Sequence, residues 1–243
     1  MKTNAYFNAL CCSLVILSFA ANAETIQEKE LTLPTKGIKA FKIDASAGFL
    51  HVKGKAGISE ILVEATLISD EFEDTDFTLN LEEKGNKAFL ITKVGKRAPN
   101  YNAKIDLTVT VPNNLVLDIV DGSGEIKVDD FTNNVRVDDG SGSMQLTNIR
   151  GELNVEDGSG KIIIQNIGGD LRLDDGSGSV EITDVKGDVR VEDGSGSITL
   201  RGIDGHVIVD DGSGSINVDG AKSFTLIDDG SGSVNLSNVK ERS

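Results

Sequence analysis

From residue 121 onward, apolar and polar residues alternate in two short runs that recur with a fixed period of 18. The unit is clear in residues 175–192, DGSGSVEITDVKGDVRVE, which we number as positions 1 to 18. Apolar residues occupy positions 6 and 8, and again positions 15 and 17. Alternation with a period of two is typical of a β-strand with one buried face, so each unit is expected to contain two short strands.

The tetrapeptide Asp-Gly-Ser-Gly opens every unit, and its copies are evenly spaced by one period. Its aspartates are Asp121, Asp139, Asp157, Asp175, Asp193, Asp211 and Asp229. A fixed period of this length is typical of a repeat architecture in which each unit forms one coil. The sequence therefore predicts an all-β fold, a parallel β-solenoid in which one 18-residue unit makes one coil.

The two apolar pairs lie nine positions apart, which predicts a flattened coil with two sides. A three-sided coil with six-residue sides has the same period, but it would repeat apolar residues every six positions. Positions 5 and 12 are largely polar, so that alternative does not fit. Position 11 is apolar, as at Ile149 and Ile167, and we expect it to close one end of a thin core.

Two turns join the strands of each unit, and glycine is prominent in both. Gly-Ser-Gly forms the first turn, where backbone angles closed to other residues are expected. The second turn has glycine at position 13 in four units, at Gly151, Gly169, Gly187 and Gly205. The pattern breaks in the last complete unit, where Ser223 and Phe224 stand at positions 13 and 14.

Residues 24–120 lack the exact repeat and are predicted to form an irregular β cap that starts the same solenoid. No Pro-rich or Ser-rich linker separates them from residues 121–243, which hold the seven repeats. An acidic loop is expected at 69–76. Strands are expected at 47–52, 61–65, 77–81, 88–92, 105–111 and 115–120.

Residues 1–23 have the pattern of a secretory signal peptide. Lys2 precedes an apolar run over residues 9–20, and Ala21-Asn22-Ala23 provides an A-x-A cleavage site. The run is shorter than the roughly 20 residues that a membrane-spanning helix needs. Cys11 and Cys12 would leave with the signal, so the exported chain would carry no disulfide. We therefore expect a periplasmic, outer-surface or secreted protein with no transmembrane span.

Acidic residues dominate the charge. Without residues 1–23 the chain has 23 basic and 39 acidic side chains, and the repeat half holds most of the excess. Nucleic acids and anionic lipid surfaces need a basic face, so neither is an expected partner. Cations or basic partners fit better, and an elongated acidic surface also explains solubility without any partner.

The order of these features resembles a bacterial family. An export signal, an irregular β region, Val-Pro-x-x-Leu at residues 111–115 and serial G-S-G-x-I-x-V units resemble the putative-adhesin β-strand-repeat domains, whose function is unknown. The resemblance covers roughly residues 40–240. It implies a secreted or surface β-solenoid and brings no catalytic residues with it.

Carboxylates recur at positions 1 and 18 and suggest a ladder along one edge of the rod. Oxygen-rich sites of this kind suit Ca²⁺, and calcium-binding β-rolls also use 18-residue coils. That motif has an aspartate ligand at position 6, where this chain has Ile, Met or Val, so its ligand set is not transferred. The candidate metal ligands are Asp139, Glu156, Asp157, Asp174, Asp175, Glu192, Asp193, Asp210 and Asp211.

A structural role explains the aspartate at position 1 equally well. Aspartate before Gly-Ser-Gly can accept backbone N–H groups in an Asx-turn. The two interpretations predict opposite effects of pH. Repulsion within a ladder raises the carboxyl pKa in the folded state, whereas Asx-turn hydrogen bonds lower it.

An enzyme is the less favoured class. His51 and His206 are far apart in sequence and have no nucleophile context, and the repeat interval never varies, which leaves no inserted loop to wall a pocket. A glycan-active β-helix enzyme stays an alternative, for which a cleft lined by Asp and Arg would be evidence.

We expect a non-enzymatic, adhesin-like or cell-envelope scaffold that requires no cofactor, with Ca²⁺ binding as the alternative. The ligand is left open among surface, protein and glycan partners. The chain is expected to be monomeric or to associate by its ends or edges.

Overall fold

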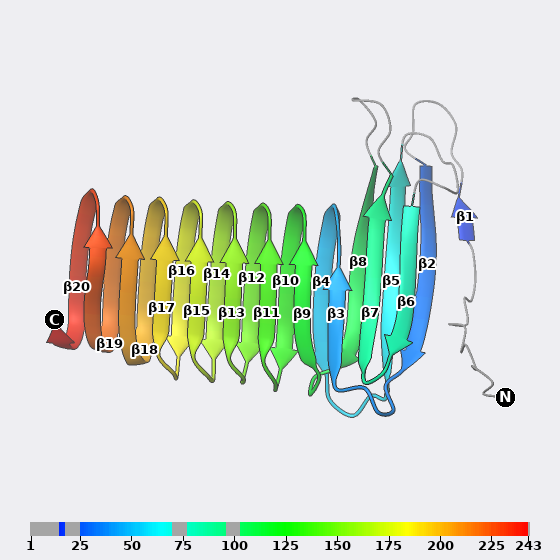
Figure 1. Ribbon diagram of the computed structural model, residues 1–243, viewed down its shortest axis with the longest axis horizontal. Coiled ribbons are helices and arrows are strands. Elements are labelled where there is room, and N and C mark those ends of the chain that lie inside the picture. Colours follow the sequence, from blue (N-terminus) through cyan, green and yellow to red (C-terminus); the bar gives the residue numbers. More distant parts are fainter. Residues whose placement is uncertain (1–14, 18–24, 70–76, 96–102, 243) are drawn as a thin grey trace.

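The computed structural model describes residues 15–17, 25–69, 77–95 and 103–242. Strands make up all of the regular structure in these ranges, and they stack into a rod with a wider N-terminal end (Figure 1). The predicted β-solenoid is confirmed. Most of the predicted signal peptide and almost all of the predicted acidic loop lie outside the described residues, so neither is tested.

Two layers of strands form the rod. The first sheet follows hydrogen-bonded pairs in the order β2 (Thr25–Pro34), β5 (Glu60–Ser69), β8 (Ala103–Pro112), β4 (Gly48–Lys55), β10 (Gly124–Phe131), β12 (Gly142–Ile149), β14 (Gly160–Ile167), β16 (Gly178–Val185), and then the first halves of β18 (Gly196–Asp211) and β19 (Gly214–Asp229), ending at β20 (Gly232–Arg242).

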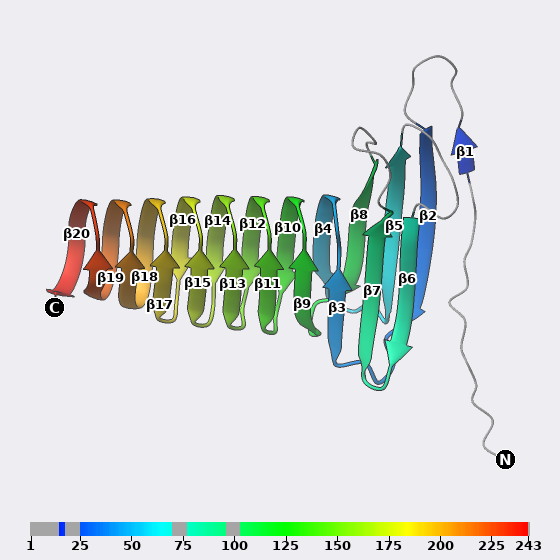
Figure 2. The same cartoon turned by 45° about the horizontal axis from the view of Figure 1, so that its top comes forward.

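The second sheet covers the other side of the same core. Its order is β6 (Phe77–Lys84), β7 (Lys87–Val94), β3 (Ala40–Asp44), β9 (Val116–Asp121), β11 (Val135–Asp139), β13 (Leu153–Asp157), β15 (Leu171–Asp175), β17 (Val189–Asp193), followed by the second halves of β18 and β19. Each coil thus contributes one strand to each sheet, as the two apolar pairs predict (Figure 2). A short strand, β1 (Val15–Leu17), pairs antiparallel with β2.

Neighbouring coils pair in parallel, and the pairing offset equals the repeat period. Ile126 lies opposite Met144, and Met144 opposite Ile162. Side chains at positions 6, 8, 11, 15 and 17 of the inner coils are at most 4% exposed. This thin core is what an alternating pattern produces when two sheets face each other.

An additional coil precedes the repeats and is hidden in the sequence. Strands β3 and β4 stack directly on β9 and β10, so that Gly48 lies opposite Gly124 with a pairing offset of 76 in place of the repeat period. Strands β5 to β8 lie between these two coils in the sequence only. In space they lie on the N-terminal side of the additional coil, where they extend both sheets. The six strands expected in residues 24–120 are present, whereas β2 and β3 were not predicted.

The two turns differ from the sequence prediction in one respect. The arch after the first-sheet strand is made at position 10, which has positive φ and is Asp130, Asn148, Asn166 or Asp184 in the first four coils. Asn and Asp tolerate this left-handed region better than most residues. Glycine at position 13 is needed for space instead, because a Cβ on Gly169 would lie 2.7 Å from the carbonyl carbon of Gly151.

The last complete unit is shifted by one residue. Phe224 lies opposite Val207 and Leu226 opposite Val209, so the pairing offset falls from 18 to 17 before it recovers at Asp229. Phe224 is buried, whereas Ile227, at apolar position 17 of the repeat, is 53% exposed. This β-bulge therefore turns Phe224 toward the core and Ile227 toward the solvent, the reverse of what the repeat predicts.

Candidate binding surface

The aspartates at position 1 form a buried column inside the Gly-Ser-Gly turns. Asp175 is 1% exposed, and the other members from Asp121 to Asp211 are at most 7% exposed. In each of five coils one carboxylate oxygen, Oδ1, accepts the backbone N–H of the serine two residues later, over 3.0–3.3 Å. This is the turn-capping role that the sequence suggested.

The second oxygen of the column has no such support. Oδ2 is buried without a hydrogen-bond partner in five members: Asp121, Asp139, Asp157, Asp175 and Asp193. Burial is the largest influence on these carboxyls and raises the pKa of Asp121, Asp139, Asp175 and Asp193 to about 6. The pKa values of Asp157 and Asp211 are also raised, again mainly by burial. Backbone hydrogen bonds lower the pKa values of these aspartates, and burial outweighs them.

The carboxylates at position 18 point the other way. Glu156, Asp174, Glu192 and Asp210 lie on the outer surface of the second sheet, one residue before a buried aspartate. Adjacent residues of a strand face opposite sides, so the two sets of carboxylates do not share one edge. The single ladder expected from the sequence is wrong in this respect: it is a buried column and a separate outer row.

Calcium binding by these residues is not tested by this geometry and stays a prediction. Within the described ranges, no three His, Cys, Asp or Glu side chains are grouped so as to hold a metal ion. The column members Asp139, Asp157, Asp175, Asp193 and Asp211 are separated from the outer row by the strand itself.

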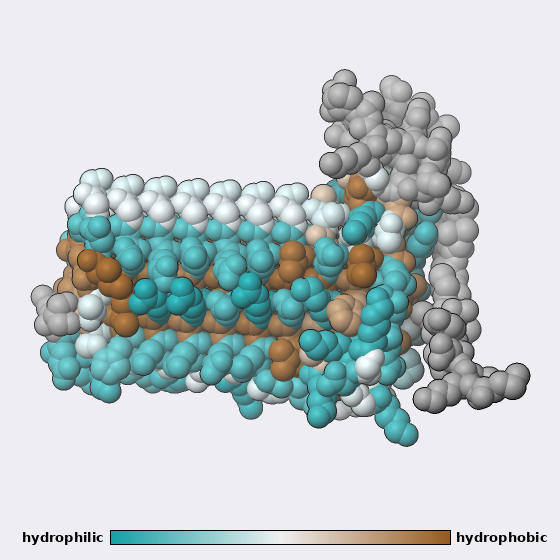
Figure 3. All heavy atoms as spheres, viewed as in Figure 1, coloured by the Kyte–Doolittle hydropathy of each residue, from teal (hydrophilic) through white to brown (hydrophobic). Residues whose placement is uncertain are grey.

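A shallow groove runs along the outer face of the second sheet. It has a volume of about 630 Å³ and crosses strands β9 to β18. Figure 3 shows it as an apolar stripe between two hydrophilic rows. Residues at position 15 line its floor, and because their side chains are buried in the core, the floor is formed by their backbone; they include Val135, Leu153, Leu171 and Val189.

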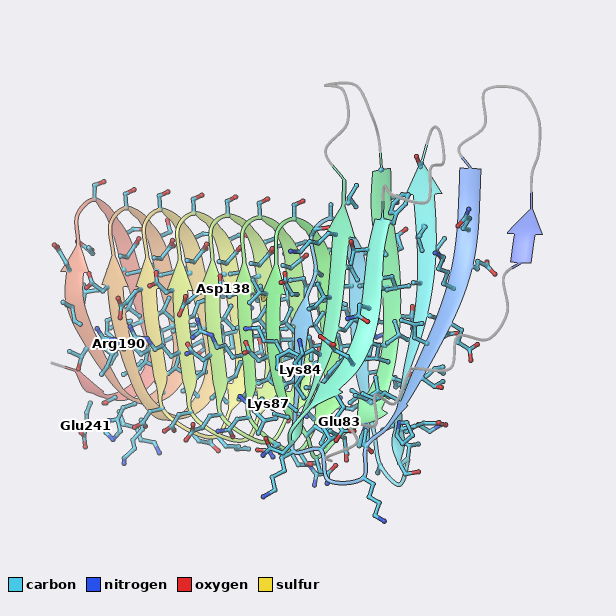
Figure 4. The ribbon with its side chains drawn as sticks, turned by 45° about the vertical axis from the view of Figure 1, so that its right-hand side comes forward. Glu83, Lys84, Lys87, Asp138, Arg190 and Glu241 are labelled. Atoms are coloured by element: carbon cyan, nitrogen blue, oxygen red, sulfur yellow. The ribbon has the colours of Figure 1, made fainter. Side chains whose placement is uncertain are left out.

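One wall of the groove is made by position 16, where Arg136, Arg172 and Arg190 stand (Figure 4 labels Arg190). Their guanidinium groups reach toward the outer acidic row: Arg136 lies 3.0 Å from Glu156, and Arg172 lies 2.7 Å from Glu192. Because the charged ends are engaged there, the aliphatic stems can cover the floor of the groove.

These ion pairs act most clearly on Glu192. Arg190 also contacts Glu192, over 2.9 Å. The hydrogen bond from Arg190, with the charge of Arg172, lowers the pKa of Glu192. Glu192 is therefore held ionised, and its pKa is shifted in the opposite direction from the pKa values of the buried aspartates.

The other wall is position 14, with Asn134, Glu152, Asp170 and Asp188. Asp170 accepts the backbone N–H of Asp188, and Asp188 accepts that of His206, over 2.9 and 2.8 Å. Each of these side chains thus braces the next coil. The wall combines rigidity with carboxylate oxygen atoms that can accept hydrogen bonds from a ligand.

Sequence reasoning missed this groove. Positions 14 and 16 looked like mixed outward positions, and only the recurrence of arginine at position 16 hinted at a surface feature. The burial of the column could have been predicted from the sequence. Positions 15 and 17 face inward, and the same alternation makes position 1 of the next unit face inward and position 18 face outward.

The two histidines remain apart: His51 pairs with Asp129 on the first sheet, 3.0 Å away, and His206 lies on the second.

Among the described residues, no helix is long and apolar enough to cross a membrane. A comparison with curated proteins finds no match for the chain.

Comparisons with solved structures find bacterial proteins of low identity. A putative adhesin from Bacteroides fragilis is 17% identical over 91% of this chain and 97% of its own, with a TM-score of 0.44. A putative cell adhesion protein from Clostridium sporogenes is 13% identical over 90% and 100%, with a TM-score of 0.36. A putative adhesin from Parabacteroides merdae is 13% identical over 89% and 95%, with a TM-score of 0.33. The family model described as Toastrack DUF4097 matches residues 60–243, and this chain belongs to that family.

Proposed function

We propose that this chain is an exported, non-enzymatic binding protein of the cell envelope or cell surface, and that it holds its partner along the groove of the second sheet. The observation that carries the proposal is the continuity of the groove, which crosses several coils with the same residue positions in register. A repeated, open surface suits an extended partner better than a small molecule, which is normally enclosed in a pocket.

The groove contains both Asp and Arg, the residues that would have favoured an enzyme. Two features argue against catalysis there. A general acid needs a raised pKa, and the carboxyls with a raised pKa, such as Asp175, face the interior. In the outer row, Glu192 is held ionised by Arg190 and Arg172. The groove is also open along its length, so it does not exclude water from a reacting bond.

The resemblance of the repeats to putative-adhesin domains agrees with a binding role, and the predicted signal peptide agrees with export. An adhesin ligand would be a protein or glycan at a surface. The carboxylate wall at Asp170 and Asp188 would accept hydrogen bonds from hydroxyl or amino groups of such a partner.

The test is to block the groove without touching its core. Asn154→Trp places a large ring on the outer face of β13, in the middle of the groove. Gln145→Trp is the matched control, because Gln145 lies on the outer face of β12 in the opposite sheet. Both proteins would be applied to immobilised glycans and extracellular-matrix proteins, alongside the wild type.

We expect the wild type and Gln145→Trp to be retained by the same probes, and Asn154→Trp to lose that retention. Equal retention of both variants would exclude the groove as the binding site. Release of soluble sugar or peptide from the probes by the wild type would show that the protein is an enzyme.

A further inference from the structure

The C-terminal end of the rod presents an open strand edge. Strand β20 pairs with β19 on one side, and no other described strand pairs with its outer side (Figure 1). In the coils before it, each turn glycine binds the next coil: the N–H of Gly214 donates to the carbonyl of Ser231 over 3.0 Å. The backbone of β20 is in the conformation that accepts a further strand.

The core is also incomplete at this end. Val234, Leu236 and Val239 occupy the inward positions of the last coil but are only partly buried. Their equivalents one coil earlier include Ile216, which is fully buried, and Val218, which is 2% exposed. Covering these side chains would stabilise the rod, since buried apolar area contributes about 25 cal/mol per Å².

The first part of the edge, residues 232–239, lacks the protection that natural edge strands carry. Charged residues or proline normally prevent edge-to-edge pairing, and residues 232–239, GSVNLSNV, contain neither; the first charge of the strand comes at Lys240. The strands at the other end of the rod do carry charges. Residues 28–30 of β2 are Glu-Lys-Glu, and residues 82–84 of β6 are Glu-Glu-Lys. The charges make the N-terminal end a poor partner for β20.

The β20 sequence is complementary to itself. Residues 233–237 read Ser-Val-Asn-Leu-Ser, with polar residues facing outward and apolar residues facing the core. If two copies pair antiparallel about Asn235, serine meets serine on the outside and Val234 meets Leu236 on the inside. A contact that uses the same patch on both subunits closes on itself as a two-fold dimer.

A side-chain ladder agrees with this pairing. Asn235 donates its amide to Asn217 over 3.1 Å, and a second Asn235 would extend this amide ladder by one rung. We propose that β20 is the interface of a tail-to-tail dimer of this chain, formed by antiparallel pairing of two β20 strands about Asn235.

The test compares two equivalent substitutions in the full chain, with Cys11 and Cys12 replaced by serine. Asn235→Lys places two like charges together at the two-fold axis, whereas Asn217→Lys makes the same change one coil inside the rod. Sedimentation equilibrium should show a wild-type dimer, a dimer for Asn217→Lys, and a dissociation constant raised roughly tenfold or more for Asn235→Lys. Circular dichroism would establish that both variants keep the fold.

Asn235→Cys in the same background gives a second readout, which does not depend on weakening the dimer. Two cysteines at the axis should form an intermolecular disulfide on mild oxidation, and Asn217→Cys should form none. A monomeric wild type, a dimer unaffected by Asn235→Lys, or a dimer in which Asn235→Cys fails to cross-link would each overturn the proposal.

Discussion

At the scale of single residues, the aspartate of each repeat meets two opposing demands. Its Oδ1 atom holds the Gly-Ser-Gly turn, which requires a short side chain with an acceptor. Burial of its Oδ2 atom penalises the ionised form, and the next aspartate of the column adds repulsion at Asp121, Asp139 and Asp175. Asparagine could supply the same turn bond without a charge, so the presence of aspartate makes the rod sensitive to pH.

The rod should be more stable in mild acid than at neutral pH. The folded pKa of Asp175 and three other members is about 6, against an ordinary value of 3.8. Between these values the folded state binds more protons than the unfolded state, so the free energy of unfolding falls as pH rises. We expect a higher Tm at pH 5 than at pH 7.5, by several degrees, in thermal melts followed by circular dichroism.

Asp175→Asn should reduce this pH dependence, because it removes one titrating member while keeping the turn acceptor. Asp174→Asn, its exposed neighbour, should leave the dependence unchanged. If Tm depended on pH equally in the two variants, the column would not be the source of the pH dependence. The same melts with calcium or with a chelator test the calcium hypothesis, which fails if the metal does not shift Tm.

The glycine at position 4 should be intolerant of any side chain. Gly160 has φ +150°, and a Cβ there would overlap the carbonyl oxygen of Gly142 in the preceding coil. Gly160→Ala should cost roughly 2–4 kcal/mol, from the backbone penalty and overpacking. Gly57→Ala is the control, since Gly57 also has positive φ but has open space around it. It should cost about 1 kcal/mol, and urea denaturation would measure both. Similar losses would show that the contact between coils is unimportant.

At the scale of elements, β19 shows that packing overrides the repeat. The repeat places Thr225 at an inward position, but the chain shortens its offset by one residue and buries Phe224 instead. Burial of an aromatic ring contributes more than a regular register, so the bulge is retained.

The register shift predicts which substitution is harmful. Phe224→Ala should destabilise the protein by about 3–5 kcal/mol, the usual range for emptying a buried aromatic site. Thr225→Ala should cost less than about 1 kcal/mol. The opposite order in denaturant melts would show that the unshifted register is the one formed.

At the scale of the whole molecule, each coil contacts only its neighbours, so stability should be nearly a sum over coils. Deleting residues 157–174 removes one complete coil and brings equivalent positions together. The product should fold into a shorter rod with reduced Tm. Deleting only residues 157–165 removes half a coil and places first-sheet positions in the second sheet, so that product should not fold. Circular dichroism and small-angle scattering distinguish these outcomes.

Export, which residues 1–23 predict, is tested on the whole chain. Expression with residues 1–23 in a bacterial host should yield a product that begins at Glu24, detected by N-terminal sequencing. A product that retains Met1 or Lys2 would exclude cleavage after Ala23. Cleavage of an Ala23→Lys variant at the same place would also contradict the predicted cleavage site.

The sequence by itself determined the period, the two strands per coil and the thin core, and it offered turn capping as one of two roles for the aspartate. These features are local or repeat at a constant interval, so the pattern of positions carries them. The extra coil of β3 and β4 could not be predicted, because its pairing offset of 76 is set by long-range strand pairing and not by a repeat.

Only the tertiary structure decided where the groove lies and how deeply the aspartate column is buried. The alternation along the strand separates the column from the outer row, but the burial that raises the carboxyl pKa values depends on how the coils stack. One wall of the groove is held by contacts between coils, in which Arg136 reaches Glu156 and Arg172 reaches Glu192. Such contacts join residues that lie a full period or more apart, so they depend on how coils stack and not on the order of residues within any one coil.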